Sequence, residues 1–295
     1  MQKLLSLCLN QYNFESGKIL MNSILRGTIL YASDMYYDLK ENEIRQIERI
    51  EEIFLRKLLK TNKGCPISSL YLEIGQTPAR FEIMKMRLLY LKYILEQPEN
   101  SNVLQMLKMQ LEMPSSGDWA STCVKNLEYL DMKITFEEIK KLSKKTYKDM
   151  IKERIKQVSL EYLMEKRGKK GRGVVYSCLE MSEYLVPFNN NLTIEEKCEI
   201  FEIRNRMVNI PFNFSSNCEY KCECGEREDM NHIYQCELYN EKDRPIMPYE
   251  QIFNGNMKQQ IYVYKKFKQN LERREQLKTT SNPCDLYSPL LCSKG

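Results

Sequence analysis

The chain holds a single histidine, His232, and this histidine lies inside a short cluster of cysteines. Cys222 and Cys224 are separated by one residue, Gly225 follows at once, and Cys236 lies four residues after His232. Side chains four residues apart share one face of a helical turn, and a glycine can adopt the positive φ of a sharp turn. Three thiolates and one imidazole form the donor set that tetrahedral Zn²⁺ takes. The pattern predicts a small zinc-folded module with Cys222, Cys224, His232 and Cys236 as ligands.

Two alternatives to this ligand set stay open. The chain has 11 cysteines in 295 residues, so some thiols cluster by chance, and the Cys-x-Cys pair is less usual in zinc sites than Cys-x₂-Cys. In addition, Cys218 lies four residues before Cys222 and can replace either Cys222 or Cys224 as a ligand. A full set of four protein ligands leaves no position for water, so the predicted zinc is structural rather than catalytic.

Helical patterns cover most of the chain. Apolar residues recur at three- and four-residue steps, and glycine (11) and proline (10) are sparse. The helix that carries Ile44 to Leu58 places Glu51 on its polar side, and a long basic helix is predicted from Lys144 to Lys166. A last amphipathic helix is predicted from Met257 to Gln276. Capping patterns predict further helix starts at Thr77 with Pro78 as the first helical residue, at Asp118 before Trp119, at Thr135 with Glu138, and at Thr193 with Glu196.

These patterns give a mostly α fold, with a helical bundle followed by a second helical unit that carries the small zinc module. Loop-forming stretches divide the chain into a bundle over 1–112, a basic helical connector over 113–190, a helix with the zinc module and a C-terminal helix over 191–275, and a flexible tail over 276–295. No apolar run approaches the about 18 residues of a membrane span, so no membrane contact is expected. The odd cysteine count without a secretory signal indicates a reducing compartment, cytoplasmic or nuclear.

Positive charge is concentrated in one segment. Residues 133–172 contain 14 Lys or Arg residues against 6 Asp or Glu residues, in a chain whose net charge is +5. Such a surface favours contact with phosphates, although a solvated charged face explains it equally well. By contrast, residues 218–236 hold five acids against two bases, so we expect the zinc module to fix a fold rather than grip phosphate. The loop after the basic helix supplies the predicted nucleic-acid contacts, which are Lys166, Arg167, Lys169, Lys170 and Arg172.

Residues that could carry catalysis are missing from the pattern. The only histidine is assigned to metal, which removes the usual general base at neutral pH. The sequence has no Asp-Asp pair for a two-metal site and no glycine-rich phosphate loop. We therefore predict no catalytic residues, and the chain is not expected to be an enzyme by itself.

Several stretches follow one another along the chain, namely Ile29–Asp34, Ile50–Leu59, Leu70–Gly75, the helix from Pro78 to Leu95, Gly117–Trp119, Arg204–Met207, the Cys/His cluster and Tyr249–Met257. Taken in this order, they resemble the C-terminal region of non-LTR retrotransposon reverse transcriptases. The resemblance covers roughly residues 15–275, and the order of the stretches carries it rather than any single motif.

This resemblance implies a function in holding nucleic acid. Residues 1–112 would correspond to the polymerase thumb, which packs along the template–primer duplex. The remainder would correspond to a segment with a CCHC zinc knuckle that helps to hold element RNA or target DNA, with Arg204 and Arg206 as further contacts. The family's paired catalytic aspartates belong to a palm that this chain lacks, and Tyr31–Asp34 is not that motif.

The chain therefore resembles a C-terminal piece that binds RNA or DNA and does not polymerise alone, with a palm-containing reverse transcriptase as the expected protein partner. No restriction-type endonuclease pattern follows the cysteine cluster. The alternative function is a zinc-containing helical scaffold that docks a partner chain, which the acidic character of residues 218–236 favours.

Overall fold

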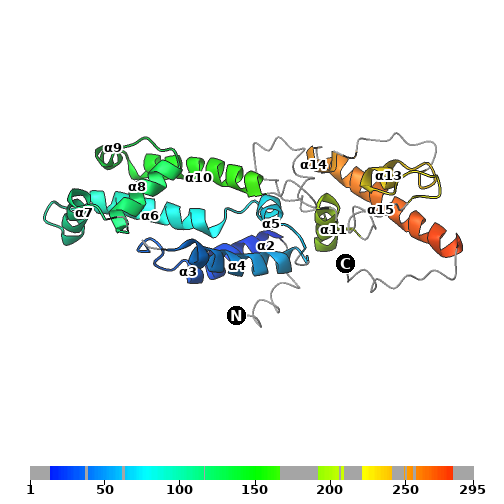
Figure 1. Ribbon diagram of the computed structural model, residues 1–295, viewed down its shortest axis with the longest axis horizontal. Helices are drawn as coiled ribbons and strands as arrows, with labels where there is room; N and C mark the ends of the chain where they lie inside the picture. The colour runs from blue at the N-terminus through cyan, green and yellow to red at the C-terminus, as the bar shows by residue number, and fades with distance from the viewer. Residues whose placement is uncertain are drawn as a thin grey trace. The chain divides into compact units, whose positions relative to one another are not determined.

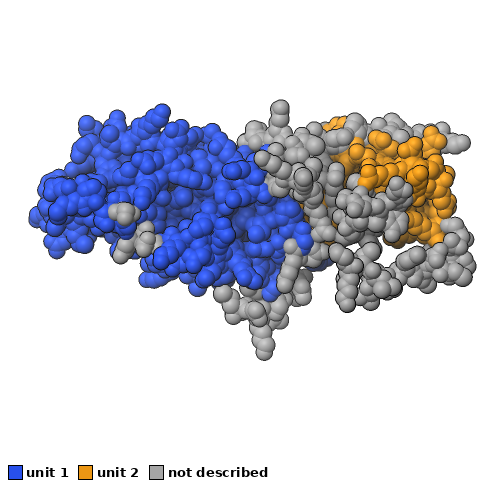
Figure 2. All heavy atoms as spheres, in the orientation of Figure 1, with its two compact units in different colours: residues 1–187, 192–198 blue, residues 188–191, 199–295 orange. Residues whose placement is uncertain are grey.

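In the computed structural model, the chain divides into two compact units, shown in different colours in Figure 2. Unit 1 comprises residues 1–187 and 192–198, and unit 2 comprises residues 188–191 and 199–295. Within the described residues, regular structure is helical apart from one isolated β-bridge, which confirms the predicted mostly α fold class. The structure describes residues 14–36, 39–61, 64–115, 117–166, 192–205, 207–208, 221–240, 249, 251–254 and 257–281.

Unit 1 is built around α6 (Ala79–Leu95), which runs through its middle in Figure 1. Helix α4 (Glu41–Leu58) packs on one side of α6, and α8 (Trp119–Tyr129) and α10 (Lys144–Lys166) pack on the other. The α10 segment of the predicted connector thus packs on the predicted bundle within one unit. The remaining described helices of unit 1 are α2 (Phe14–Leu20), the π-helix η1 (Met21–Leu25), α3 (Arg26–Ile29), α5 (Ile67–Ile74), α7 (Asn102–Glu112) and α9 (Phe136–Lys141).

The main core of unit 1 lies between α6 and the helices that follow it. Helix α10 contributes the buried residues Tyr147, Ile151 and Ile155, and Trp119 packs edge-on against Tyr90 with ring centroids 5.8 Å apart. Helix α7 was not predicted, because its exposed methionines hide its short buried stripe of Leu104 and Leu107. The other buried members of this core are Phe81, Leu88, Leu91, Ile94, Leu95, Ala120, Cys123, Leu127, Leu130 and Ile139.

One predicted surface position of α4 is wrong. Glu51 is fully buried, and its carboxylate lies at the centre of a polar network. Its Oε1 accepts a hydrogen bond from Arg26 Nε at 2.7 Å, and its Oε2 accepts one from the Tyr71 hydroxyl at 2.8 Å. The ion pair makes burial of this glutamate tolerable, because a buried charge is strongly destabilising without a partner.

The same carboxylate changes the start of α6. Glu51 Oε2 also accepts the backbone N–H of Ala79 at 3.0 Å, so a side chain from another helix caps α6. Pro78 takes the N-cap position and Ala79 is the first helical residue, whereas the sequence predicted Thr77 and Pro78 for these places. A cap from a distant residue leaves no spacing pattern in the sequence, which explains the error of one residue.

The other predicted helix starts are confirmed. Asp118 accepts the backbone N–H of Ser121 at 2.6 Å, and Thr135 forms a reciprocal capping box with Glu138. Thr193 and Glu196 form the same pair of reciprocal hydrogen bonds at the start of α11 (Ile194–Arg204). These caps could be read from the sequence because each partner lies three residues away.

Unit 2 is organised along its longest described helix, α15 (Met257–Ser281), against which α13 (Met230–Gln235) and α14 (Gln251–Asn254) pack. Helix α11 (Ile194–Arg204) begins in unit 1 and ends in unit 2. Helix α15 continues to Ser281, beyond the predicted end at Gln276, so residues 276–281 are helical where a flexible tail was predicted. The tail residues 282–295 lie outside the described residues. No helix in the described ranges is long and apolar enough to cross a bilayer.

Candidate metal centre and basic face

A tight turn positions the first two cysteines of the cluster. An isolated bridge between Lys221 and Arg227 closes the turn, and the backbone N–H of Cys222 donates to the Glu226 carbonyl at 2.8 Å. Gly225 sits at the tip with φ +91°, a conformation that residues with a side chain rarely adopt. The glycine that follows the cysteine pair is therefore required by the backbone of the turn.

Helix α13 positions the other two predicted ligands, His232 and Cys236. The side chain of Asp229 caps this helix by accepting the backbone N–H of His232 at 2.8 Å. The backbone N–H of Cys236 donates to the His232 carbonyl at 2.6 Å, so both side chains leave the same helical turn. The four-residue spacing of His232 and Cys236 therefore places both side chains on one helical turn, as predicted.

The turn and the helix bring the four predicted ligands together. The ligand atoms of Cys222, Cys224, His232 and Cys236 all lie within 4.8 Å of one another, so the cluster can hold a metal ion. Cys222 Sγ lies 3.7 Å from Cys236 Sγ, and Cys224 Sγ lies 3.4 Å from His232 Nε2 and 4.0 Å from Cys236 Sγ. Cys222 and Cys236 are buried, whereas Cys224 is exposed. The alternative ligand Cys218 lies outside the described residues.

Tyr239 supports the cluster and was missed by the sequence analysis. Its hydroxyl lies 3.1 Å from Cys222 Sγ, and its ring meets the His232 ring edge-on. Burial raises the pKa of the Cys222 thiol, but the backbone N–H of Cys224 and the Tyr239 hydroxyl outweigh this effect and lower it to about 7. The environment of Cys222 thus favours the thiolate, the form that binds metal.

A buried ion pair attaches the segment that carries the cluster, residues 221–240, to α15. We call this segment the metal module. Glu228 is 1% exposed and accepts a hydrogen bond from Arg274 Nη2 at 2.9 Å, while Lys278 Nζ lies 3.1 Å away. The five acids counted between Cys218 and Cys236 include Glu228 and the helix cap Asp229. At least two of the five carboxylates therefore have partners inside the unit, and the count from the sequence overstates the negative charge that the module presents to solvent.

A second anchor is an asparagine of α15. Asn270 is 2% exposed, and its Nδ2 donates to the carbonyls of Ile233 and Tyr234 at 3.0 and 3.2 Å. Asn240 Nδ2 donates to the Cys236 carbonyl at 2.7 Å. The amides of Asn270 and Asn240 thus bind backbone carbonyls at the end of α13 and directly after it. The sequence gives no signal for the two Asn270 contacts, because they join residues 37 and 36 positions apart.

Two of the seven predicted nucleic-acid contacts are described. Lys166 is exposed at the end of α10, and its Nζ lies 5.6 Å from the centre of the Tyr162 ring. Arg204 is 2% exposed; its Nε donates to the Ile252 carbonyl at 2.9 Å and its Nη2 to Gln260 at 2.7 Å. Its predicted surface role is therefore wrong, because the guanidinium is engaged inside unit 2. Arg167, Lys169, Lys170, Arg172 and Arg206 lie outside the described residues.

The described part of the basic segment presents a row of lysines on α10. Lys145, Lys148 and Lys152 are exposed and recur at three- and four-residue steps, so they follow one face of the helix. In the described part of the chain, none of the three has a carboxylate within ion-pair distance, whereas Lys144 pairs with Glu96. We call Lys145, Lys148 and Lys152 the lysine row.

Comparison with known proteins finds no relative of this chain. No family model matches the chain, and no curated protein and no solved structure matches it. The metal cluster and the lysine row are therefore the features from which a function is proposed.

Proposed function

We propose that the Cys/His cluster binds Zn²⁺ as a structural ion. Zinc bonds of about 2.3 Å to sulfur and about 2.0–2.1 Å to nitrogen place tetrahedral ligands about 3.8 Å apart for two sulfurs and about 3.5 Å apart for sulfur and nitrogen. The separations of 3.7 and 4.0 Å between sulfurs and 3.4 Å between sulfur and nitrogen support this assignment. Because four protein ligands leave no open position, the ion stabilises the module instead of activating water.

We further propose that the chain binds RNA or DNA as the C-terminal part of a non-LTR retrotransposon reverse transcriptase. The observation that carries this proposal is the lysine row. An α-helix rises about 1.5 Å per residue, so the row places three ammonium groups along about 10 Å of one helix face. Such an array can neutralise successive phosphates of a nucleic-acid strand. The family assignment rests on the order of the resembling stretches, and the helical fold and the metal cluster are compatible with it.

In this proposal, the chain contributes binding and not catalysis. Polymerisation would require a palm with its paired aspartates, which a second polypeptide or a longer chain would supply. The free thiols of the described cysteines suit a reducing compartment, the cytoplasm or the nucleus.

The experiment replaces the lysine row by glutamine in one variant, Lys145→Gln/Lys148→Gln/Lys152→Gln. We expect weaker binding of labelled RNA and DNA oligonucleotides. The slope of log K against log salt should flatten by about 0.9 for each duplex phosphate contact that is lost, and by about 0.7 for a single strand. Titrations of RNA and DNA at several salt concentrations measure both quantities and show which polymer is preferred.

A matched variant separates local contacts from total charge. Lys125→Gln/Lys258→Gln/Lys265→Gln removes three exposed lysines that lie outside both α10 and the thumb-like residues 1–112, and it should bind as the wild type does. Equal affinity and equal slope in the two variants would exclude the lysine row as the contact surface. Absence of any binding at low salt would exclude the function.

A second function, docking of a partner chain, is favoured by one exposed face. Met106, Met109 and Met113 are 56–71% exposed on or just after α7, and methionine side chains adapt readily to partners. Under this alternative, Met106→Lys/Met109→Lys abolishes co-purification with a palm-containing reverse transcriptase and leaves oligonucleotide affinity unchanged. Salt-sensitive oligonucleotide binding with no such protein complex would favour the first function.

A further inference from the structure

The hydroxyl of Tyr239 lies between a predicted metal ligand and a buried carboxylate. Its oxygen is 3.1 Å from Cys222 Sγ and 3.4 Å from Glu228 Oε1. All three side chains are buried, so little solvent reaches the hydroxyl. A phenol has one hydrogen, which it can direct to the sulfur or to the carboxylate but not fully to both. The neighbouring charges decide which of the two accepts it.

Cations of α15 supply the donors of the carboxylate. Arg274 donates to Glu228 from both Nε and Nη2, the second at 2.9 Å, and Lys278 Nζ lies 3.1 Å from Oε2. Such charge-assisted bonds are roughly twice as strong as bonds between neutral groups. The two cations also offset the charge of the carboxylate. Glu228 therefore competes weakly for the tyrosine hydrogen.

The sulfur of Cys222 has no comparable side-chain donor. The backbone N–H of Cys224 donates to it. With a metal ion in the cluster, the ligand atoms of Cys224, His232 and Cys236 bind the ion and have no hydrogen to give. Tyr239 is then the one side-chain donor that the described part of the chain places on Cys222 Sγ. A buried, negatively charged sulfur is stabilised by such a donor, so the sulfur accepts the hydrogen.

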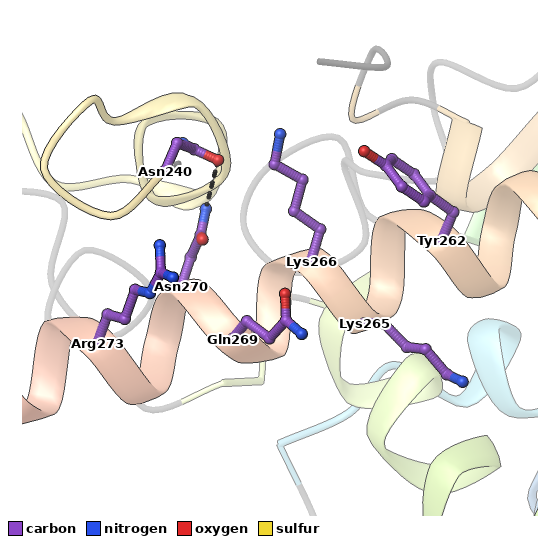
Figure 3. A pocket seen from close by; sticks show the side chains of 7 residues that line it. All are labelled: Asn240, Tyr262, Lys265, Lys266, Gln269, Asn270 and Arg273. Carbon is purple, nitrogen blue, oxygen red and sulfur yellow. Dashed lines mark hydrogen bonds between the residues drawn. The ribbon is translucent and has the colours of Figure 1, made fainter. Parts of the chain in front are cut away.

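Helix α15 also holds the backbone from which Tyr239 projects. Arg273 Nη1 donates to the Tyr239 carbonyl at 2.8 Å, and the Tyr239 N–H donates to the Cys236 carbonyl at 3.1 Å. Figure 3 shows Arg273 and Asn270 directed from α15 toward the end of the metal module, with a hydrogen bond between Asn270 and Asn240. The phenol is therefore held beside the cluster by contacts on both sides, as an outer contact that orients a metal ligand requires.

We propose that Tyr239 is a positioning residue of the metal centre, whose hydroxyl donates to the Cys222 sulfur while the Glu228–Arg274 pair keeps its hydrogen available for that bond. The inference rests on the proposed zinc binding and adds a regulator to it. Arg274 lies 46 positions after Glu228 and outside the metal module, so α15 controls how tightly the cluster holds its ion. Outer contacts of this kind change metal affinity by about 10–100-fold.

The first test measures zinc affinity of the full chain by competition with a chelator. Tyr239→Phe keeps the ring that meets His232 edge-on and removes only the hydroxyl, and it should bind zinc about tenfold or more weakly. Tyr234→Phe makes the same change in the same module, at a hydroxyl that makes no hydrogen bond to any of the four ligands, and should bind as the wild type does. Equal affinity of the two variants overturns the role of Tyr239.

The second test reads the hydrogen bond itself, with Co²⁺ in place of Zn²⁺. A hydrogen bond to sulfur lowers the energy of the sulfur electrons, so its loss in Tyr239→Phe should move the sulfur-to-cobalt charge-transfer band to lower energy. Tyr234→Phe should leave the band where it is. A Tyr239 that acts through packing alone would also leave the band in place, and an unmoved band in Tyr239→Phe therefore overturns the proposal.

The third test asks whether Arg274 acts through Tyr239. In Arg274→Gln, Glu228 loses its guanidinium and takes the tyrosine hydrogen, so zinc affinity should fall and the cobalt band should move as in Tyr239→Phe. The affinity loss from Arg274→Gln should largely vanish when Tyr239→Phe is already present. Additive losses, with no band shift in Arg274→Gln, would show that the ion pair acts on the fold alone. A wild-type chain that binds neither Zn²⁺ nor Co²⁺ contradicts the metal centre itself, whereas a metal-binding wild type with unaffected variants contradicts only the role of Tyr239.

Discussion

We expect that removal of the proposed zinc ion unfolds the module of residues 221–240 and leaves unit 1 intact. The buried apolar side chains of this module are few, so the short segment has little core of its own. Structural zinc contributes about 10–16 kcal/mol to the folding of comparable small modules. We expect chelation, or His232→Ala, to remove far more folding free energy than the remaining contacts between the module and α15 contribute. Acidification should have the same effect, because protons compete with the metal for the thiolates.

Hydrogen exchange measures this result by segment. Chelation should expose the backbone N–H groups of Cys222, Ile233 and Cys236, which are hydrogen-bonded within the module. The only tryptophan, Trp119, lies in unit 1, where its Nε1 donates to the Asp34 carbonyl at 2.8 Å, so its fluorescence reports unit 1 alone. The midpoint of the unfolding transition that Trp119 fluorescence reports should therefore be the same before and after chelation.

A matched variant shows whether the effect belongs to the cluster. Cys123→Ala removes a buried thiol of the unit 1 core and should leave the exchange of residues 221–240 unchanged. Protection of Cys222 and Cys236 that survives both chelation and His232→Ala would show that the module folds without metal, and the structural role of the ion would then be wrong.

Replacement of Glu51 by alanine destabilises unit 1 by about 3–5 kcal/mol, the usual cost of breaking a buried ion pair by removing one partner. The variant leaves Arg26 with a buried charge, and it removes the acceptor of the Tyr71 hydroxyl and of the Ala79 backbone N–H. Because Ala79 is the first residue of α6, the loss also frays the helix on which the rest of unit 1 packs. Denaturant unfolding followed by Trp119 fluorescence measures the change in free energy.

The control for this prediction is Glu153→Ala, the same substitution at an exposed position of α10. It should change the free energy of unfolding by no more than about 0.5 kcal/mol. A Glu51→Ala chain as stable as Glu153→Ala would mean that the buried network contributes nothing to unit 1.

The sequence predicted the features that depend on near neighbours. Asp118, Thr135 and Thr193 cap their helices through residues three positions away, and His232 and Cys236 share a helical turn because they are four positions apart. In each case, helical geometry converts a short spacing into a contact, so these helix starts and the proximity of His232 to Cys236 could be read from the chain.

Features that depend on distant partners could not be read in this way. Glu51 looks like a surface residue of α4 until Arg26 and Tyr71 are seen beside it. From the sequence, Arg204 is predicted to contact phosphate, but in the structure its guanidinium donates a hydrogen bond to the Ile252 carbonyl. The attachment of the metal module to α15 has the same character, since Glu228 and Arg274 are joined only in the folded unit.

Metal content of the purified chain tests the central claim most directly. Native mass spectrometry of the wild type should show one zinc per chain, and Cys218→Ala should retain it, because the ligand atoms of Cys222, Cys224, His232 and Cys236 already complete a set of four. His232→Ala and Cys222→Ala should lose the ion. A wild-type chain that is folded over residues 221–240 yet free of metal, or a His232→Ala chain that keeps its zinc, would contradict the metal centre and the role assigned to it.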